Sequence, residues 1–434
     1  MKQTLQDKLQ KRKFKKPNRL AYDFLYHFVF NTFLAWRVNA KYKIIDDINK
    51  EKGPCFLIAN HQSRMDYIYT VKSSYPRRLN FVAQYNEFFR SHLHWIFKVA
   101  NIVPKKNFNP DVKTIKSISA LVKQGAAICI FPEGTTSICG HNQPSYIGTG
   151  NLFKHHKIPV YMCKLEGAFL TNHKVCLDLR KGQVNVTMSK LFNGDEFDNL
   201  TCEQVEEIID RNLYQDDYEW NKKERIKYDT KGRSCHNLHQ LCYRCPRCGT
   251  EFMMLGKGNE IKCLKCGNGA IMNDYYDLIP YDKECVIPES PSKWVDEERR
   301  RVYLEIKNNP DFEIIEKVKI GTLPKQEYLK DYKTSEPCGE GEIKINHQGF
   351  FFKGIRFQDD FTFHLNYEQL ATLDIVLDTS YFALYVNGEY YDFFPEREIV
   401  GKLLLIVEEM HRLHSNKWKN FPWMDWIYKE KTNK

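Results

Sequence analysis

The sequence predicts an α/β domain with a mixed, partly parallel sheet flanked by helices, followed by a small cysteine-rich unit and a β-rich module. Three observations support this prediction: short apolar runs alternate with helical patterns early in the chain, paired cysteines follow, and short alternating strands come last. With 434 residues, the chain is too long for one ordinary hydrophobic core. We therefore expect four parts, with the ranges 1–40, 41–229, 235–275 and 290–434.

Four apolar runs define the predicted sheet of the first domain. They are PCFLIAN (54–60), AAICIFPEG (126–134), IPVYMCKL (158–165) and QVNVTMSKL (183–191). A helix is expected at 112–125, with Gly125 as its C-terminal cap, and a charged helix at 203–228. Apolar strands separated by helices indicate a buried, partly parallel sheet, in which ligands bind beyond the carboxyl ends of the strands.

The segment before this domain is first basic and then apolar. Its first nineteen residues hold eight lysines or arginines against one aspartate, which supplies +7 of the net charge of +10. This charge suits an anionic surface, either phospholipid headgroups or nucleic acid, and a solvated basic tail is the alternative. In the apolar stretch 20–38, Asp23, His27 and Asn31 share one stripe of a helix. We predict a helix lying in the membrane interface rather than crossing it, with a buried domain helix as the alternative.

The fourteen cysteines predict reduced thiols and a metal site. Several lie inside apolar strands and no secretory signal is recognisable, so we expect a cytosolic protein without a disulfide framework. Four form two C-x-x-C pairs, each followed by a glycine: Cys245 with Cys248, and Cys263 with Cys266. This spacing predicts a zinc ribbon, in which four thiolates hold a structural Zn²⁺ and leave no open position for catalysis. Cys242 is a less favoured ligand.

The last part of the chain is expected to form a sheet closed by a helix. Alternating strands run from residue 341 onward, Asn387-Gly388 is a hairpin signal, and 398–414 has the pattern of an amphipathic helix. This pattern is similar to that of pleckstrin-homology-like, lipid-sensing modules, at the level of fold only.

Two polar clusters follow two of the central strands. NHQSRMD (60–66) stands at the exit of the first run, and FPEGTTS (131–137) stands at the exit of the second. If these strands are neighbours, both clusters meet in one crevice at the carboxyl edge of the sheet. A His and an Asp five residues apart form a weak pattern alone, so the second cluster strengthens the prediction of an active site.

Both clusters resemble motifs of a known family. The N-H-x4-D block and the F-P-E-G-T-x-S block, about 70 residues apart, are similar to the first and third motifs of the glycerolipid acyltransferases, which include 1-acylglycerol-3-phosphate acyltransferase. KIPV (157–160) is similar to the fourth motif, and the resemblance covers roughly residues 20–225. It implies transfer of a fatty acyl group from acyl-coenzyme A or acyl carrier protein to the hydroxyl of a lysophosphatidic-acid-like acceptor, in phospholipid synthesis.

The resemblance also implies roles for individual residues. His61 would be the general base, and Asp66 would orient its ring and stabilise the imidazolium. The residues that would bind the acceptor are Asn60, Lys105, Lys106, Glu133, Gly134 and Thr135. A structural His61 beside a helix-capping Asp66 is the alternative to the catalytic interpretation.

Two departures from the family pattern concern the acceptor. Thr136 stands where the family usually has an arginine that helps to bind the acceptor phosphate. The second motif usually ends in another arginine, whereas this chain reads ANIVPKK (100–106), so Lys105 or Lys106 would supply the charge. An acyltransferase for glycerol phosphate, dihydroxyacetone phosphate or another lysophospholipid is therefore the first alternative.

A non-enzymatic zinc-ribbon scaffold that binds nucleic acid or protein is the second alternative. We favour an enzyme bound peripherally to the cytoplasmic face of a membrane, without a nucleic-acid partner. The ribbon or the C-terminal module would then position the enzyme or recruit a protein partner.

Overall fold

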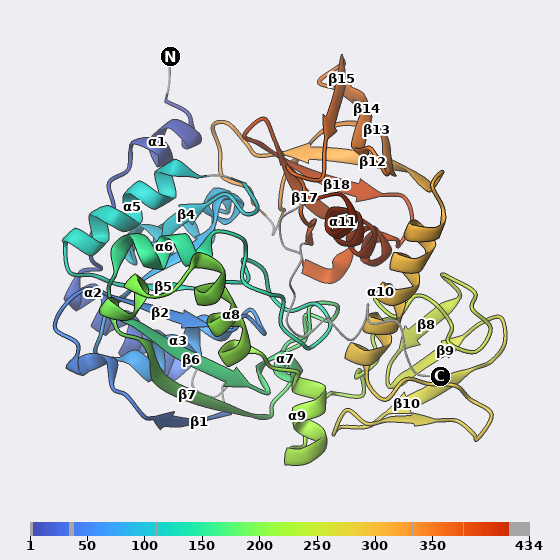
Figure 1. The fold of residues 1–434 in the computed structure, drawn as a ribbon, viewed down its shortest axis with the longest axis horizontal. Coiled ribbons are helices and arrows are strands. Elements are labelled where there is room, and N and C mark those ends of the chain that lie inside the picture. Colours follow the sequence, from blue (N-terminus) through green and yellow to red (C-terminus); the bar gives the residue numbers. More distant parts are fainter. Residues whose placement is uncertain (1–2, 34–38, 110, 331–332, 376, 416–434) are drawn as a thin grey trace.

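Three sheets and the helices around them make up the chain (Figure 1). The computed structural model describes residues 3–33, 39–109, 111–330, 333–375 and 377–415. The α/β domain (blue to green) is followed by the cysteine-rich unit (yellow) and the β-rich module (orange to red), so the predicted order is confirmed. Residues 416–434, which the predicted last part includes, lie outside the described residues.

The sheet of the first domain has seven strands in the order β1-β7-β6-β2-β5-β3-β4. The five strands from β6 to β4 are parallel, whereas β7 pairs antiparallel with β6 and parallel with β1. The strands are β1 (Asn39–Ile44), β2 (Cys55–Ala59), β3 (Leu79–Gln84), β4 (Val103–Lys105), β5 (Ala127–Ile130), β6 (Val160–Glu166) and β7 (Gln183–Phe192). The predicted mixed, partly parallel sheet is confirmed.

Helices cover both faces of this sheet because alternate side chains of each strand point to opposite sides. On β2, Phe56 and Ile58 pack with residues of α5, α6 and α8, whereas Leu57 packs with α3. These helices are α3 (Asp66–Ser74), α5 (Val112–Lys123), α6 (Thr149–His156) and α8 (Cys202–Leu213). Shorter helices are α4 (His94–Val99), α7 (Ala168–Thr171), η3 (Ile48–Lys50), η4 (Tyr85–Phe89), η5 (Gly194–Asp198), η6 (Leu238–Gln240) and η7 (Leu377–Thr379).

Capping residues set the helix ends. The Asp111 side chain accepts the Thr114 amide at the start of α5, and Gly125, just beyond its end, has the expected positive φ of 71°. The single helix expected at 203–228 was wrong, because the chain forms α8 and then α9 (Asp217–Glu224). Asp216 caps the start of α9, so a new helix begins there instead of the old one continuing.

The basic segment at the start of the chain packs on the protein. α1 (Leu5–Lys11) buries Leu5 in a cluster with Tyr85 and Leu329. The Leu5 amide also donates to the Lys325 carbonyl at 3.0 Å. Most of the lysines between residues 8 and 16 remain exposed. The segment therefore packs on the protein through its apolar side chains and presents its basic side chains to solvent.

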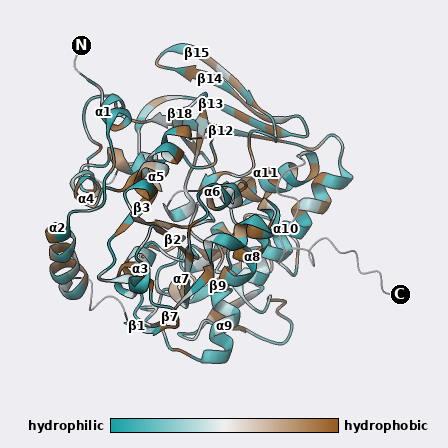
Figure 2. Ribbon diagram, turned by 60° about the vertical axis from the view of Figure 1, so that its left-hand side comes forward, coloured by the Kyte–Doolittle hydropathy of each residue, from teal (hydrophilic) through white to brown (hydrophobic). Residues whose placement is uncertain are grey.

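The apolar stretch forms α2 (Arg19–Phe24) and the π-helix η1 (Leu25–Phe33), and residues 34–38 lie outside the described residues. Its polar stripe faces the domain, because the Tyr75 hydroxyl lies 3.4 Å from Asp23 Oδ1 and 3.1 Å from His27 Nε2. The large apolar side chains that remain exposed on it are Leu20, Phe24 and Phe28. Figure 2 shows these turns standing out at one side of the molecule.

Four short antiparallel strands build the cysteine-rich unit. Their order is β11-β10-β9-β8, and the strands are β8 (Met254–Lys257), β9 (Glu260–Cys263), β10 (Gly269–Met272) and β11 (Leu278–Pro280). Ser290 then caps α10 (Pro291–Asn308), which has a proline at its first position. The helix therefore begins inside the proline-containing stretch IPESPSKW (287–294).

The C-terminal sheet has seven antiparallel strands in the order β15-β14-β13-β12-β18-β17-β16. They are β12 (Glu313–Thr322), β13 (Glu336–Asn346), β14 (Gly349–Arg356), β15 (Asp359–Leu365), β16 (Asp374–Ile375), β17 (Phe382–Val386) and β18 (Glu389–Pro395). Asn387 and Gly388, with φ of 50° and 81°, form the predicted hairpin between β17 and β18. The buried helix α11 (Val400–His414) closes the module, whose likeness to pleckstrin-homology-like folds stays a prediction.

The three regions share one large hydrophobic cluster. Phe169 and Tyr218 of the α/β domain, Ile261 of β9, and Phe350 and Leu403 of the C-terminal module all belong to it. Buried ion pairs reinforce it, as Arg299 on α10 contacts two glutamates of α11. The regions therefore pack as one body, and the predicted domain boundaries stay predictions.

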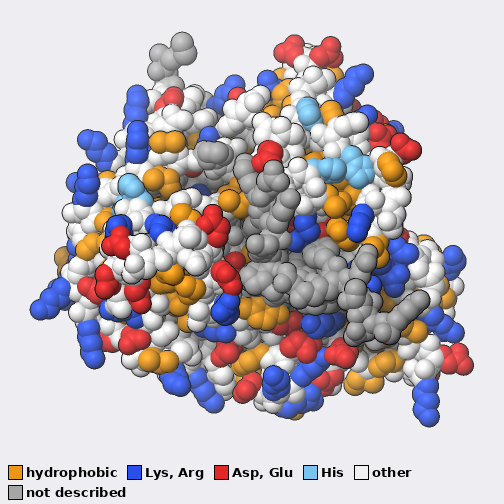
Figure 3. Space-filling model, in the orientation of Figure 1, with side chains coloured by type: hydrophobic (Ala, Val, Ile, Leu, Met, Phe, Trp, Pro, Cys, Tyr) orange, Lys and Arg blue, Asp and Glu red, His pale blue; other side chains and the backbone are white. Residues whose placement is uncertain are grey.

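Among the described residues, every helix falls short of the length and apolar character that a membrane span requires. On the face seen in Figure 3, basic and acidic side chains are interspersed around the rim.

Candidate functional site

His61 and Asp66 form a hydrogen-bonded pair beyond the carboxyl end of β2. His61 Nδ1 lies 2.8 Å from Asp66 Oδ2, and Asp66, the first residue of α3, is fully buried. The Ser63 amide and hydroxyl donate to the same carboxylate at 2.9 and 2.8 Å. The Asp66 carboxylate thus takes part in three hydrogen bonds at the start of α3. It therefore holds the His61 ring at Nδ1 and leaves Nε2 as the nitrogen that can take a proton.

The His61 ring is fixed by packing and remains accessible. It stacks on Phe131 with ring centroids 4.3 Å apart, and its side chain is 24% exposed. Phe131 opens the second polar cluster, so the two sequence blocks are neighbours in space, as the order of β2 and β5 in the sheet requires. The arrangement resembles the imidazole and carboxylate of an acyl-transfer site, without requiring a serine nucleophile.

Asn60 and Glu133 are placed to support this loop. Both polar atoms of the Asn60 amide bond the backbone of Leu165 at 2.7 Å. Glu133 Oε1 accepts the His61 amide at 2.7 Å and Glu133 Oε2 accepts the Gln143 amide at 3.1 Å. Burial raises the pKa of Glu133 well above its usual range, although these bonds oppose the shift. The substrate contacts expected of both residues stay predictions, while the geometry gives both a positioning role.

The rest of the second cluster surrounds a turn. Gly134 has a φ of +75°, a conformation that glycine adopts without strain, and its carbonyl accepts the Asn107 side chain at 2.7 Å. Thr135 Oγ1 accepts a hydrogen bond from Lys174 Nζ at 3.1 Å. Lys174 follows α7, beyond the carboxyl end of β6, and sequence reasoning missed it.

The two lysines expected to bind phosphate lie at the end of β4 and just after it. Lys105 Nζ stands 5.8 Å from the centre of the Tyr146 ring, and burial lowers the pKa of Lys105, with Asp111 opposing the shift. Lys106 Nζ instead donates to the Gly388 carbonyl of the C-terminal module at 2.6 Å. Lys106 thus joins the first domain to the C-terminal module, and its contact with an acceptor stays a prediction.

A buried carboxylate of the C-terminal module reaches the same edge of the sheet. Both oxygens of Asp374, on β16, accept Gln84 Nε2 at 3.1 and 3.0 Å, and Asn107 also donates to this carboxylate. Burial raises the pKa of Asp374 to about 6, although Lys174, Gln84 and Asn107 oppose the shift. Burial lowers the pKa of Lys174 to about 8, and Asp374 opposes that shift. No motif pointed to Asp374, because it lies in a different module from the site.

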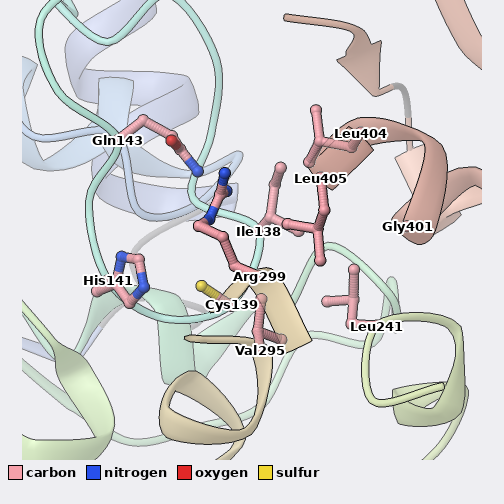
Figure 4. Close-up of a pocket in the computed structure, with 10 residues that line it drawn as sticks. All are labelled: Ile138, Cys139, His141, Gln143, Leu241, Val295, Arg299, Gly401, Leu404 and Leu405. Carbon is pink, nitrogen blue, oxygen red and sulfur yellow. The ribbon is translucent and has the colours of Figure 1, made fainter. Parts of the chain in front are cut away.

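A small cavity lies between the first domain and the C-terminal helices (Figure 4). Its volume is about 10 Å³, room for about one water molecule, so it is no acyl-chain pocket. Beside it, His141 Nε2 and Asp296 Oδ1 form a buried pair at 2.9 Å. This region joins the modules.

The four predicted cysteine ligands converge. Their sulfur atoms all lie within 4.8 Å of one another, with Sγ separations of 3.6 Å for Cys245 and Cys266 and 3.8 Å for Cys248 and Cys263. Zn–S bonds of about 2.3 Å place tetrahedral sulfur atoms about 3.8 Å apart, so the geometry fits such an ion. Cys242 is not part of the group, and all fourteen cysteines are free thiols.

The comparison with protein families names the first domain. Residues 39–165, which contain the His61–Asp66 pair and Glu133, match the family model described as Acyltransferase. These residues form an acyltransferase domain. They span β1 through most of β6, so the match covers the central parallel strands and both polar clusters.

The acyltransferase domain is similar to several 1-acyl-sn-glycerol-3-phosphate acyltransferases. The chloroplastic BAT2 of Brassica napus is 28% identical over 193 residues, 42% of this chain and 55% of that protein. The chloroplastic LPAT1 of Arabidopsis thaliana is 29% identical over 118 residues, 26% of this chain and 33% of that protein. The Streptococcus pneumoniae enzyme is 26% identical over 121 residues, 27% of this chain and 45% of that protein. The chain thus spans about half or less of the length of the curated relatives it matches.

One solved structure is also similar, the 1-acyl-sn-glycerophosphate acyltransferase PlsC of Thermotoga maritima. The TM-score is 0.36 and the identity 16%, over 45% of this chain and 91% of that one.

Proposed function

We propose that the protein transfers a fatty acyl group from acyl-coenzyme A or acyl carrier protein to the hydroxyl of a lysophosphatidic-acid-like acceptor. The observation that supports this most is the His61–Asp66 pair, 2.8 Å apart at the carboxyl edge of the acyltransferase domain. The relatives act, by their names, on 1-acyl-sn-glycerol 3-phosphate.

In the proposed reaction, His61 Nε2 takes the proton of the acceptor hydroxyl while the hydroxyl oxygen attacks the thioester carbonyl carbon of the acyl donor. The carbon–sulfur bond then breaks, and the imidazolium returns the proton to the departing thiolate. Asp66 holds the Nδ1–H tautomer throughout and stabilises the transient imidazolium. Atoms and charges balance with two substrates and no covalent enzyme intermediate.

At the acceptor side of the site, Thr136 stands where the family usually has an arginine that helps to bind the acceptor phosphate. An ammonium is nevertheless close to this turn, since Lys174 Nζ contacts the neighbouring Thr135 at 3.1 Å. Glycerol phosphate, dihydroxyacetone phosphate and other lysophospholipids remain the alternative acceptors that Thr136 favours. All of the phosphorylated candidates would need a cation at this edge of the sheet.

Peripheral membrane binding on the cytoplasmic face fits the first forty residues. The exposed apolar side chains of α2 and η1 lie next to a basic segment, a combination that binds anionic bilayers. Phe30 of η1 stacks edge-on against Tyr67 of α3, with ring centroids 6.0 Å apart. Because Tyr67 follows Asp66, this surface would hold the catalytic pair near the lipid.

Cys245, Cys248, Cys263 and Cys266 would hold a structural Zn²⁺. The ion would cross-link the two C-x-x-C turns. In each turn, the amide of the following glycine donates to the carbonyl of the first cysteine, from Gly249 to Cys245 at 2.9 Å and from Gly267 to Cys263 at 3.0 Å. Four thiolates leave no open position, so the proposed reaction does not involve this site.

The test is acyl-coenzyme A consumption with lysophosphatidic acid on anionic vesicles. His61→Ala should abolish turnover, whereas His155→Ala, an exposed histidine on α6, should leave it unchanged. Turnover that persists in His61→Ala contradicts the mechanism. If the wild-type protein is inactive with a full panel of donors and acceptors but binds nucleic acid or protein, the scaffold alternative replaces this proposal.

A further inference from the structure

We propose that Lys174, Asn107 and Gln84 form a phosphate-binding subsite of the acyltransferase domain, which Asp374 of the C-terminal module occupies as an internal carboxylate. The inference rests on the proposed function and deepens it by naming the phosphate cation and a competitor for it. Neither Lys174 nor Asp374 lies in either sequence block of the site.

The donors of this subsite share one origin. Gln84 ends β3, Asn107 follows β4, and Lys174 lies beyond β6, so all three stand at the carboxyl edge of the same sheet. This is the edge at which ligands bind in parallel sheets. Thr135, after β5, joins them through the 3.1 Å bond from Lys174 Nζ, and Asn107 bonds the Gly134 carbonyl at 2.7 Å. The subsite is therefore built on the turn that follows Glu133.

The chemistry of the donors suits an oxyanion. Two side-chain amides bond one buried carboxylate, and the Lys174 ammonium, held on Thr135 Oγ1 at 3.1 Å, interacts with that carboxylate electrostatically. The anion present comes from the appended module: Asp374 accepts Gln84 at 3.0 and 3.1 Å and Asn107 as well. A phosphomonoester offers the same kind of acceptor oxygens with a larger charge.

The module also holds Lys174 in place. The Asp378 amide donates to the Lys174 carbonyl at 3.1 Å, and Lys106 Nζ donates to the Gly388 carbonyl at 2.6 Å. Asp374 thus sits among several contacts that fix the module on this edge. A phosphate brought to Lys174 faces a carboxylate that both repels it and competes for its donors, so Asp374 sets the affinity for phosphorylated acceptors.

The test measures binding of glycerol 3-phosphate to the full-length protein by calorimetry, with glycerol as the uncharged control. Asp374→Asn, which replaces the carboxylate by an uncharged amide of similar shape, should tighten binding at least about tenfold. Asp360→Asn, on β15 at the opposite edge of the C-terminal sheet, should change nothing. In the Asp374→Asn background, Lys174→Gln should remove the gain and Lys174→Arg should retain most of it. Thermal melts of each variant establish that it is folded.

The outcomes separate this inference from the proposed function. Asp374→Asn that binds no more tightly, or more weakly, makes Asp374 a simple anchor between the modules and overturns the inference. Inorganic phosphate that binds as well as glycerol 3-phosphate overturns the assignment to an acceptor. Tight binding that survives His61→Ala supports the subsite whether or not acyl transfer is found, because the assay does not depend on turnover.

Discussion

Replacing Asp66 by Asn is the sharpest test of the catalytic pair. Asp66 accepts three bonds, from His61 Nδ1 and from the amide and hydroxyl of Ser63, all between 2.8 and 2.9 Å. An asparagine has one oxygen and one NH₂ group, so part of it must donate where the carboxylate accepted. The NH₂ group would donate to His61 Nδ1, which moves the ring proton to Nε2 and leaves no free base.

The magnitude follows from the geometry of the pair. With the charge centres about 4 Å apart and an effective dielectric constant of about 20, the carboxylate stabilises the imidazolium by about 4 kcal/mol. The 24% exposure of the His61 side chain makes this an upper value. We therefore expect kcat to fall about 10³-fold, within the range of about 10²–10⁴ for general-base catalysis.

The assay is the initial rate of acyl-coenzyme A consumption at saturating acceptor, with KM measured alongside. Asp198→Asn, an exposed aspartate paired with Lys157, is the matched control and should have wild-type activity. KM should change little, because Asp66 is buried behind His61. A fall in kcat of less than about tenfold in a folded variant would falsify the orienting role of Asp66.

Three further predictions address the metal, the membrane and pH. Metal analysis should find one zinc ion per chain, and Cys263→Ser should lose this ion and unfold the ribbon. Metal content and limited proteolysis would reveal both effects, and full zinc retention in the variant contradicts the four-thiolate site. The double variant Phe24→Glu and Phe28→Glu should bind anionic vesicles at least about tenfold more weakly in a sedimentation assay, because burying each exposed ring in the bilayer contributes about 1.5–3 kcal/mol of binding free energy. Unchanged binding rules out this surface as the membrane contact. Burial raises the pKa of Asp210 from 3.8 to about 7, although hydrogen bonds from Ser145 oppose the shift. Between these two pH values the folded state binds a proton that the unfolded state has lost. The free energy of unfolding therefore falls as pH rises from about 4 to about 7, by at most about 4 kcal/mol. Asp210→Asn should flatten this dependence in urea unfolding, and an unaltered pH profile counts against it.

Local patterns in the sequence predicted the parts of the fold that local chemistry determines. The runs around Leu57 and Cys129 are apolar because both faces of the sheet are covered, and Gly125 and Asn387-Gly388 mark turns that need positive φ. The strands β1, β3 and β4 were missed, because polar residues or a proline interrupt their apolar pattern.

The candidate site divides in the same way. His61 and Asp66 lie five residues apart, and a strand end followed by a helix start brings them together, so their contact could be expected from the sequence. Lys174 and Asp374 are separated by two hundred residues and meet only because the C-terminal module packs on the sheet edge. Contacts between distant modules produce no periodicity or residue spacing in the sequence from which they could be predicted.

The contact of Leu5 with Leu329 has a consequence for how the chain is made. Domains emerging from a ribosome generally fold from the N-terminus onward. The cluster around Leu5 needs a residue more than three hundred positions later, and the Leu5 amide bonds the Lys325 carbonyl. The first helix therefore lacks these partners while the acyltransferase domain is synthesised, and it can dock fully only after residues 325–329 have left the ribosome.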